Sequence, residues 1–307
     1  MGVDLSISLG GARVSSPVTT ASGCFGAGKE MSRFVDLTTL GAVVCKTVTP
    51  NPRLGISPTR GTETASGMLN AIGLQNPGVE HFRDEDVAWL YERGIPVIPS
   101  IGGHSVEDYV ACAEALRDTP GVVALEMNLS CPNLEDRGFM FALSAERTAE
   151  VTRAVKEVSS VPVFTKLSPD VTDLRAIATA AVESGADGLS LINTTLGMAI
   201  DVETRRPKLS TGTGGLSGPA IKPIAVRCVY QVHSALPHVP IIGMGGVQSV
   251  EDAVEFILAG ATAVAIGTAN FYDPTAAERI ARGLAQWCDA RGIATLDEIR
   301  GTVKLEG

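Results

Sequence analysis

Eight short runs of mostly apolar residues, separated by turns and helical patterns, constrain the fold of this chain more than any other feature. They span residues 18–21, 42–47, 96–100, 122–128, 162–166, 188–193, 240–243 and 263–267. Near-continuous apolar strands that alternate with helices are typical of a parallel sheet whose outer face is covered. Eight such units without a linker to a second domain predict one α/β domain over residues 1–307. The expected fold is a closed (β/α)8 TIM barrel rather than an open doubly wound sheet.

The segments between these runs predict where the chain turns and where a site would form. Amphipathic helices are expected at residues 106–117, 145–158, 174–184, 221–234 and 250–258. Residues 3–17 alternate apolar and polar side chains about Gly10 and Gly11, which predicts an N-terminal β-hairpin that plugs the bottom of the barrel. Two connections are long, at 48–79 and 129–143. Long loops in a compact barrel are usually functional, and barrel active sites form at the carboxyl ends of the strands.

Charge and cysteine usage exclude several classes of function. The net charge of −9 disfavours nucleic acid as a partner, because phosphate backbones require a basic surface. The start of the chain shows no signal peptide, and the apolar run 253–269 contains Glu255 and Gly260, so no membrane span is expected. The six cysteines are far apart and form no C-x-x-C pair, which indicates neither a disulfide framework nor a zinc or iron–sulfur site. We expect a cytoplasmic protein.

Polar residues and glycines gather at the ends of the predicted strands. They are Ser22, Lys46, Thr47, Ser100, Asn128, Lys166, Asn193, Thr194, Gly245, Gly246, Gly267 and Thr268. Any one lysine in such a position could be a solvated loop charge or part of a structural ion pair. Because the carboxyl ends of all eight strands meet at one mouth, the set as a whole predicts a pocket for a polar, partly anionic ligand.

Two glycine-containing segments predict a phosphate site. Residues 243–247 follow the seventh strand, and Gly267 and Thr268 follow the eighth. Glycines allow backbone N–H groups to approach a phosphate closely, and a following helix N-terminus favours an anion. Barrels commonly use the loops after strands seven and eight for this purpose. The ligand could be FMN, a sugar phosphate or another phosphorylated compound, and the alternative is that the glycines only shape turns.

Cys131 differs from the other cysteines because it follows the fourth strand in a polar segment on the catalytic face. A thiolate there could act as a nucleophile or as a base. The four histidines, His81, His104, His233 and His238, have no metal-ligand spacing and none is an obvious partner for Cys131. The sequence therefore predicts no metal site and disfavours a Cys-His hydrolase.

Several longer motifs resemble the class I dihydroorotate dehydrogenases, in particular the NAD-linked type. The matching stretches are KTVT at 46–49, NAIGLQN at 70–76, NLSCPN at 128–133, GGLSGPAIKP at 214–223, GMGGV at 243–247 and GT at 267–268. The likeness extends along nearly the whole chain. The resemblance implies oxidation of (S)-dihydroorotate to orotate in pyrimidine biosynthesis. Serine at the position of Cys131 is typical of the membrane-bound class II, so the cysteine agrees with class I.

The resemblance also implies a role for each motif residue. FMN would be bound by Ser22, Lys46, Thr47, Ser100, Asn128, Lys166, Ile192, Gly218, Gly245, Gly246, Gly267 and Thr268. Dihydroorotate would be held by Lys46, Asn70, Ala71, Ile72, Gly73, Leu74, Asn128, Asn193 and Thr194. Cys131 would take the C5 proton while a hydride passes from C6 to the flavin. Ser100 departs from the asparagine often found there in the family, which puts its flavin contact in doubt.

The chain contains no cysteine cluster for iron–sulfur and no dinucleotide fingerprint after its first strand, so its electrons must leave through another protein. The resemblance implies a partner subunit that carries FAD and an iron–sulfur cluster, with NAD as the final acceptor and a homodimer within a heterotetramer. Three alternatives stay open: a self-sufficient homodimer that reduces fumarate, a non-redox isomerase or lyase that binds a sugar phosphate, and a catalytically silent barrel retained as an assembly partner.

Overall fold

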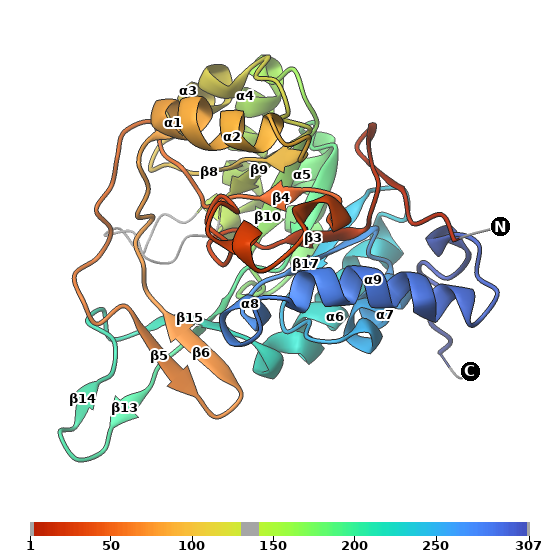
Figure 1. Ribbon diagram of the computed structural model, residues 1–307. Helices are drawn as coiled ribbons and strands as arrows, with labels where there is room; N and C mark the ends of the chain where they lie inside the picture. Colours follow the sequence, from red (N-terminus) through yellow and green to blue (C-terminus); the bar gives the residue numbers. More distant parts are fainter. Residues whose placement is uncertain (1–2, 130–140, 306–307) are drawn as a thin grey trace.

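Seven parallel strands form a strongly curled sheet at the centre of the molecule (Figure 1). The computed structural model describes residues 3–129 and 141–305. The sheet order is β3 (Val18–Thr20), β17 (Ala263–Ile266), β16 (Ile241–Met244), β11 (Gly188–Leu191), β10 (Val163–Leu167), β9 (Leu125–Asn128) and β8 (Ser100–Ile101). All of these strands lie within or next to the runs predicted from apolar patterning.

A short parallel pair closes this sheet into a barrel. The strand β4 (Val43–Val44) pairs with β7 (Val97–Ile98), and an isolated parallel bridge from Ala42 to Thr19 joins the pair to β3. Pro99 separates β7 from β8, so the third predicted strand is split in two; proline has no N–H group for the strand ladder. The structure thus confirms the predicted α/β barrel fold, although its strands are shorter than predicted.

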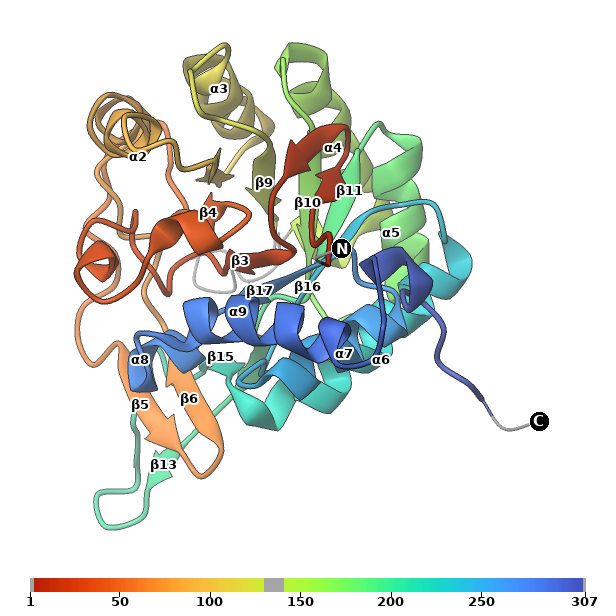
Figure 2. The ribbon, with the colours of Figure 1, turned by 45° about the vertical axis from the view of Figure 1, so that its right-hand side comes forward.

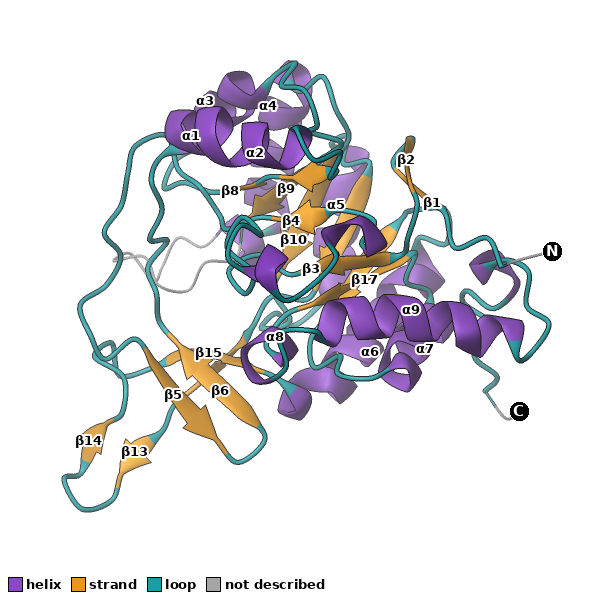
Figure 3. Ribbon diagram, in the orientation of Figure 1, coloured by secondary structure: helices purple, strands orange, loops and turns teal. Residues whose placement is uncertain are grey.

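Helices cover the outside of the barrel (Figures 1 and 3). They are α1 (Val79–His81), which continues through a π-helical segment (Phe82–Val87) into α2 (Ala88–Tyr91), α3 (Val106–Leu116), α4 (Ala145–Val158), α5 (Leu174–Glu183), α6 (Lys222–Ala235), α7 (Val250–Ala259), α8 (Ala269–Tyr272) and α9 (Ala276–Asp289). The five predicted helices are confirmed to within one residue at each end. Several begin where a side-chain oxygen caps a free backbone N–H: Ser105 before α3, Ser144 before α4 and Ser249 before α7.

The predicted N-terminal hairpin is also confirmed. It consists of β1 (Ile7–Leu9) and β2 (Ala12–Val14), which pair in an antiparallel register. Leu9 and Val14 belong to the same buried cluster as Phe164 of β10, which faces the barrel interior. At Gly10, an added Cβ would lie only 2.8 Å from Cβ of Asp187, just before β11 begins. The hairpin therefore closes the end of the barrel at which the strands begin.

A second, antiparallel sheet stands at the opposite end and was not predicted. Its order is β12 (Thr195–Gly197), β15 (Gly214–Ser217), β6 (Gly67–Asn70) and β5 (Gly61–Thr64), and the hairpin of β13 (Ile200–Asp201) and β14 (Arg206–Pro207) extends from it (Figures 1 and 2). Sequence patterning treated residues 48–79 as a loop and assigned no strand to 194–220. Asp170, which follows β10, ties this sheet to the barrel because its carboxylate accepts hydrogen bonds from the Thr195 hydroxyl and the Leu196 N–H.

None of the helices in the described ranges combines the length and the apolar character that crossing a membrane requires.

Candidate active site

A cavity of about 370 Å³ lies between the carboxyl ends of the barrel strands and the second sheet. The barrel contributes residues that directly follow β3, β4 and β11, together with side chains from β9 and β10. The second sheet contributes β6, the segment after it, and the end of β15. The lining residues are Ser22, Gly23, Cys24, Lys46, Thr47, Met68, Asn70, Ile72, Gly73, Leu74, Asn128, Lys166, Asn193, Thr194, Ser217 and Phe271.

The cavity is positively charged although the chain as a whole is acidic. Lys46 and Lys166 line it, and its described lining contains no carboxylate. Lys166 is only 4% exposed; its Nζ donates to Oγ of Ser22 at 3.2 Å and lies 3.4 Å from Oε1 of Glu126. Two ammonium groups in a confined pocket attract an anion far more strongly than the same groups on a solvated surface. The net charge of −9 therefore does not prevent an anionic ligand from binding.

A chain of hydrogen bonds orders the polar wall of the cavity. Nδ2 of Asn193 donates to Oδ1 of Asn128 at 3.0 Å, and Nδ2 of Asn128 donates to Oγ1 of Thr47 at 3.1 Å. The Thr47 hydroxyl in turn lies 2.9 Å from that of Ser100. These bonds connect β9, β8 and the segments that follow β4 and β11. Their side chains are preorganised to present amide donors and acceptors to a planar polar ligand.

The backbone of β9 is held by contacts separate from these side-chain hydrogen bonds. The phenol of Tyr109, on α3, donates to the carbonyl oxygen of Asn128 at 2.8 Å, and the Tyr109 ring packs edge-on against Phe141 at a centroid distance of 5.8 Å. Tyr109 is fully buried apart from 2% of its surface. The end of β9 is therefore anchored from the outer face of the barrel while the Asn128 side chain faces the cavity.

Part of the predicted phosphate site is brought together beside Ser217. Thr268 donates through Oγ1 to Oγ of Ser217 at 2.8 Å. Gly218 and Gly246 both have positive φ angles, +94° and +82°, and a Cβ added to Gly246 would lie 2.8 Å from the Gly218 carbonyl oxygen. Backbone conformation and close approach thus both exclude side chains from this corner, which we call the backbone cradle. That it binds a phosphate stays a prediction.

Gly245 and Gly267 have packing partners as well. A Cβ on Gly245 would lie 2.9 Å from Cβ of Ala225 on α6, and a Cβ on Gly267 would lie 3.3 Å from Cβ of Ala21. The absence of side chains there allows a helix and a neighbouring loop to approach. Their assignment to FMN binding stays a prediction.

The cavity gathers most of the residues predicted from the sequence. Those that line it are Ser22, Lys46, Thr47, Asn70, Ile72, Gly73, Leu74, Asn128, Lys166, Asn193 and Thr194. Ala71, Ser100 and Ile192 are buried and lie outside its lining, as do Gly218, Gly245, Gly246, Gly267 and Thr268. The hydroxyl of Ser100 lies 2.9 Å from that of Thr47, which does line the cavity. Cys131, the predicted base, lies outside the described residues.

Sequence reasoning missed five lining residues: Gly23, Cys24, Met68, Ser217 and Phe271. Gly23 and Cys24 directly follow Ser22, so a wider window after the first strand would have found them. Met68 and Ser217 belong to the unpredicted second sheet; Met68 carried no local signal, whereas Ser217 lies in the motif at 214–223 that resembles the family. Burial raises the pKa of the Cys24 thiol to about 11, against the opposing effect of Lys166 and Lys46. Cys24 is therefore a thiol at neutral pH and cannot replace Cys131 as a base.

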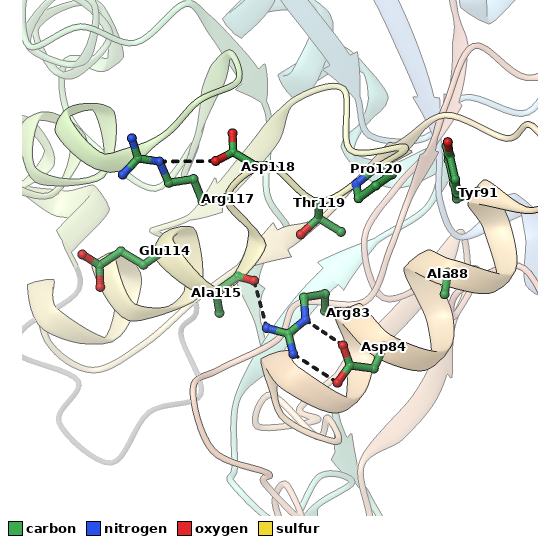
Figure 4. Close-up of a pocket in the computed structure, with 10 residues that line it drawn as sticks. All are labelled: Arg83, Asp84, Ala88, Tyr91, Glu114, Ala115, Arg117, Asp118, Thr119 and Pro120. Atoms are coloured by element: carbon green, nitrogen blue, oxygen red, sulfur yellow. Dashed lines mark hydrogen bonds and ion pairs between the residues drawn. The ribbon is translucent and has the colours of Figure 1, made fainter.

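A larger open hollow of about 610 Å³ lies on the outer helices between the helical stretch 79–91 and the end of α3 (Figure 4). Its charges are paired locally: the Arg83 guanidinium binds Asp84 and the Ala115 carbonyl, and Arg117 lies 3.8 Å from Asp118. None of the residues predicted for the site lines it. In the described part of the chain, no group of His, Cys, Asp and Glu side chains is arranged to hold a metal ion.

Comparison with known proteins gives a consistent result. The family model for dihydroorotate dehydrogenase matches residues 4–287. The catalytic subunit of dihydroorotate dehydrogenase B (NAD(+)) from Geobacillus kaustophilus is 51% identical over 297 residues, covering 97% of this chain and 95% of the relative. The protein of the same name from Listeria monocytogenes is 49% identical, covering 96% of this chain and 97% of the relative.

A solved structure agrees in fold. The crystal structure of the Eimeria tenella dihydroorotate dehydrogenase in complex with ferulenol superposes with a TM-score of 0.82 at 25% sequence identity, covering 97% of this chain and 88% of that one. The resemblance identified from the motifs is confirmed, and NAD-linked dihydroorotate oxidation is supported over the fumarate-linked and non-redox alternatives. The chain belongs to the dihydroorotate dehydrogenase family, as a catalytic subunit of the NAD(+)-linked B type.

Proposed function

We propose that the cavity at the carboxyl ends of the strands holds FMN against dihydroorotate, and that this chain carries out the first half of an NAD-linked dehydrogenation. Dihydroorotate loses a hydride from C6 and a proton from C5 to become orotate. The observation that carries the proposal is the positively charged cavity in which Lys46, Lys166, Asn128 and Asn193 converge from separate strands.

The described residues fit FMN in two respects. The backbone cradle at Gly218 and Gly246, with Thr268 beside it, has the steric and conformational character of a phosphate site. Lys166 places a buried ammonium group in the cavity, where it can face the pyrimidine part of the flavin ring. When bound, FMN supplies the hydride acceptor. Lys166 would stabilise a negative charge on the bound ring without reorganisation of solvent.

The remaining polar groups suit the substrate. Dihydroorotate is an anionic ring with carbonyl oxygens and N–H groups, and an asparagine side chain offers both a donor and an acceptor. Asn70, Asn128 and Asn193 all line the cavity, and Lys46 can bind the carboxylate. Because Asn128 and Asn193 are hydrogen-bonded to each other, the substrate ring would be held in one orientation. Ile72, Gly73 and Leu74 close the cavity from the side of the second sheet.

Cys131 is proposed as the base that removes the C5 proton. It follows Asn128 by three residues, within the range that the family model matches. The thiolate is the proton acceptor, so activity depends on the ionisation of this side chain.

A partner subunit completes the reaction. The relatives are named catalytic subunits of an NAD(+)-linked enzyme, which implies a further subunit. Of the cysteines in the described ranges, Cys45, Cys112, Cys228 and Cys288 are buried, so they are not arranged to bind an iron–sulfur cluster at the surface. We propose that the partner is an iron–sulfur flavoprotein carrying FAD, that two copies of this chain pair within a heterotetramer, and that the complex works in the cytoplasm.

The visible spectrum of the purified protein tests the proposal. A flavin absorbance that bleaches when dihydroorotate is added without oxygen, and returns when NAD⁺ is added to the complex with its partner, is the expected result. A colourless protein, or a bound flavin that dihydroorotate fails to bleach, would refute the proposal. Full activity of this chain alone with fumarate, and none with NAD⁺, would refute the partner assignment.

A further inference from the structure

Glu126 is the one acidic side chain that the structure places in direct contact with Lys166 among the described residues, and nothing in the proposed reaction uses it. It lies on β9 two residues before Asn128, so both side chains point to the same side of the strand, into the barrel. Glu126 is 0% exposed. Its Oε1 lies 3.4 Å from Nζ of Lys166, and its Oε2 has no hydrogen-bond partner among the described residues.

Fold stability does not account for this pair. A buried ion pair is favourable only when its geometry is good and its remaining lone pairs are satisfied. Here the separation is at the long end of an ion pair, and Oε2 has no hydrogen-bond partner in the described structure. The ladder neighbours of Glu126 are Ser100 on β8 and Phe164 on β10. Within residues 3–129 and 141–305, Lys166 is the cation that forms an ion pair with Glu126.

We propose that Glu126 is a positioning residue that holds Lys166 and weakens the positive charge it presents to FMN, thereby lowering the reduction potential of the bound cofactor. This inference rests on the proposed function, in which FMN lies against Lys166. A lone ammonium group would favour the reduced, more negative flavin strongly. Because the Glu126 carboxylate lies next to the Lys166 ammonium group, the cavity faces the positive end of a short dipole. The field of this dipole is weaker than that of a lone ammonium group.

The functional reason lies in the second half of the reaction. NAD⁺ is a low-potential acceptor, so a flavin that is too easily reduced would retain the electrons taken from dihydroorotate. Lys166 accelerates reduction, and Glu126 limits how far the equilibrium moves toward the reduced cofactor. The pair thus balances acceptance of a hydride against onward transfer.

Glu126→Gln tests this because it removes the charge and keeps the shape of the side chain. The midpoint potential of FMN in the purified, flavin-loaded protein is measured by anaerobic equilibration with a reference dye. At an effective dielectric constant of about 20, a unit charge this close to the site shifts the equilibrium constant for two-electron reduction about tenfold or more. This corresponds to a potential at least ~30 mV more positive. Glu126→Asp retains the charge one methylene farther from Lys166 and should shift the potential in the same direction by less.

Thr165→Val is the matched control. Thr165 lies next to Lys166 on β10, is equally buried, and faces away from the barrel interior, where its hydroxyl lies 3.3 Å from that of Thr152. The substitution Thr165→Val perturbs β10, the strand that carries Lys166, without changing any charge. The midpoint potential of FMN should therefore stay at the wild-type value even if the protein melts at a lower temperature. A flavin-loaded Glu126→Gln protein with an unshifted or more negative potential would overturn the inference.

If Glu126→Gln does not fold, Glu126→Asp decides: a positive shift supports the inference and no shift overturns it. A wild-type protein that binds no flavin would instead refute the proposed function itself. The two failures are therefore distinguished before any variant is compared.

Discussion

The substitution Gly246→Ala tests whether Gly246 belongs to a phosphate site or only shapes a turn. Gly246 follows β16 with a φ of +82°, and an added Cβ would lie 2.8 Å from both the Gly218 carbonyl oxygen and Cβ of Lys222. Gly212 has nearly the same φ, +79°, but an added Cβ there would meet nothing within 4 Å. Gly212→Ala therefore experiences the backbone strain alone, whereas Gly246→Ala experiences the strain and the steric overlap.

The magnitudes follow from these two effects. A left-handed conformation costs an L-residue about 1–2 kcal/mol, which both variants should show. Overpacking a tight site typically costs ~1–3 kcal/mol more, which only Gly246→Ala should show. For a chain of this size each kcal/mol lowers Tm by roughly 1.5–2 °C. Relief of the overlap must move Gly218 or Lys222 away from the cradle. The affinity for FMN should then fall about tenfold or more, since ~1.4 kcal/mol is a factor of ten.

The assay is flavin fluorescence during serial dilution of the holoprotein, because FMN released from the protein regains its fluorescence. Thermal melting of the same samples reports stability. Gly212→Ala should lower Tm slightly and leave FMN affinity unchanged, while Gly246→Ala should lower both. If the two variants bind FMN within twofold of each other, the assignment of Gly246 to the phosphate cradle is wrong.

Two further predictions concern pH. Cys131→Ser should retain FMN and bind orotate but lose most turnover near neutral pH, because a serine hydroxyl ionises at much higher pH than a thiol; activity should recover as pH rises, and a wild-type rate at pH 7 would remove Cys131 from the mechanism. His233, on α6, has a buried Nδ1 without a hydrogen-bond partner in the described structure, and desolvation together with Arg300 lowers its pKa from 6.5. The unfolded chain therefore takes up the proton first, so this contribution to stability is complete above pH 6.5 and is lost as pH falls from 6.5 toward the lower folded-state pKa. His233→Phe should flatten the dependence of Tm on pH in that window, and an unchanged slope would contradict the reasoning.

The elements that the sequence predicts well are those whose signal is local. Each barrel strand is a short apolar run beside a turn, and each helix has its own apolar stripe and, in several cases, a capping residue such as Ser105 or Ser249. Because eight such strand–helix units follow one another, the strands are expected to close into a barrel. The convergence of Lys46, Asn128 and Lys166 also follows, because the carboxyl ends of parallel strands meet at one edge.

Long-range contacts decided the rest. Asn70 and Gly215 are 145 residues apart, and β6 and β15 are strands because they pair with each other and not because either has a strong pattern of its own. The contact between the hydroxyls of Ser100 and Thr47 likewise joins residues 53 positions apart, and the flavin contact predicted for Ser100 stays a prediction.

Glu126 is the clearest example of a residue whose surroundings the sequence could not predict. In sequence it is one charged residue in an apolar run, and only the tertiary structure shows it buried against Lys166, 40 residues further along the chain. Sequence by itself determined the barrel and the family motifs, because local periodicity and residue type carry that information, and the resemblance implied the proposed role of Cys131. Tertiary structure decided which polar groups share the cavity and which support it from behind, since those pairings depend on distances between strands that no local pattern contains.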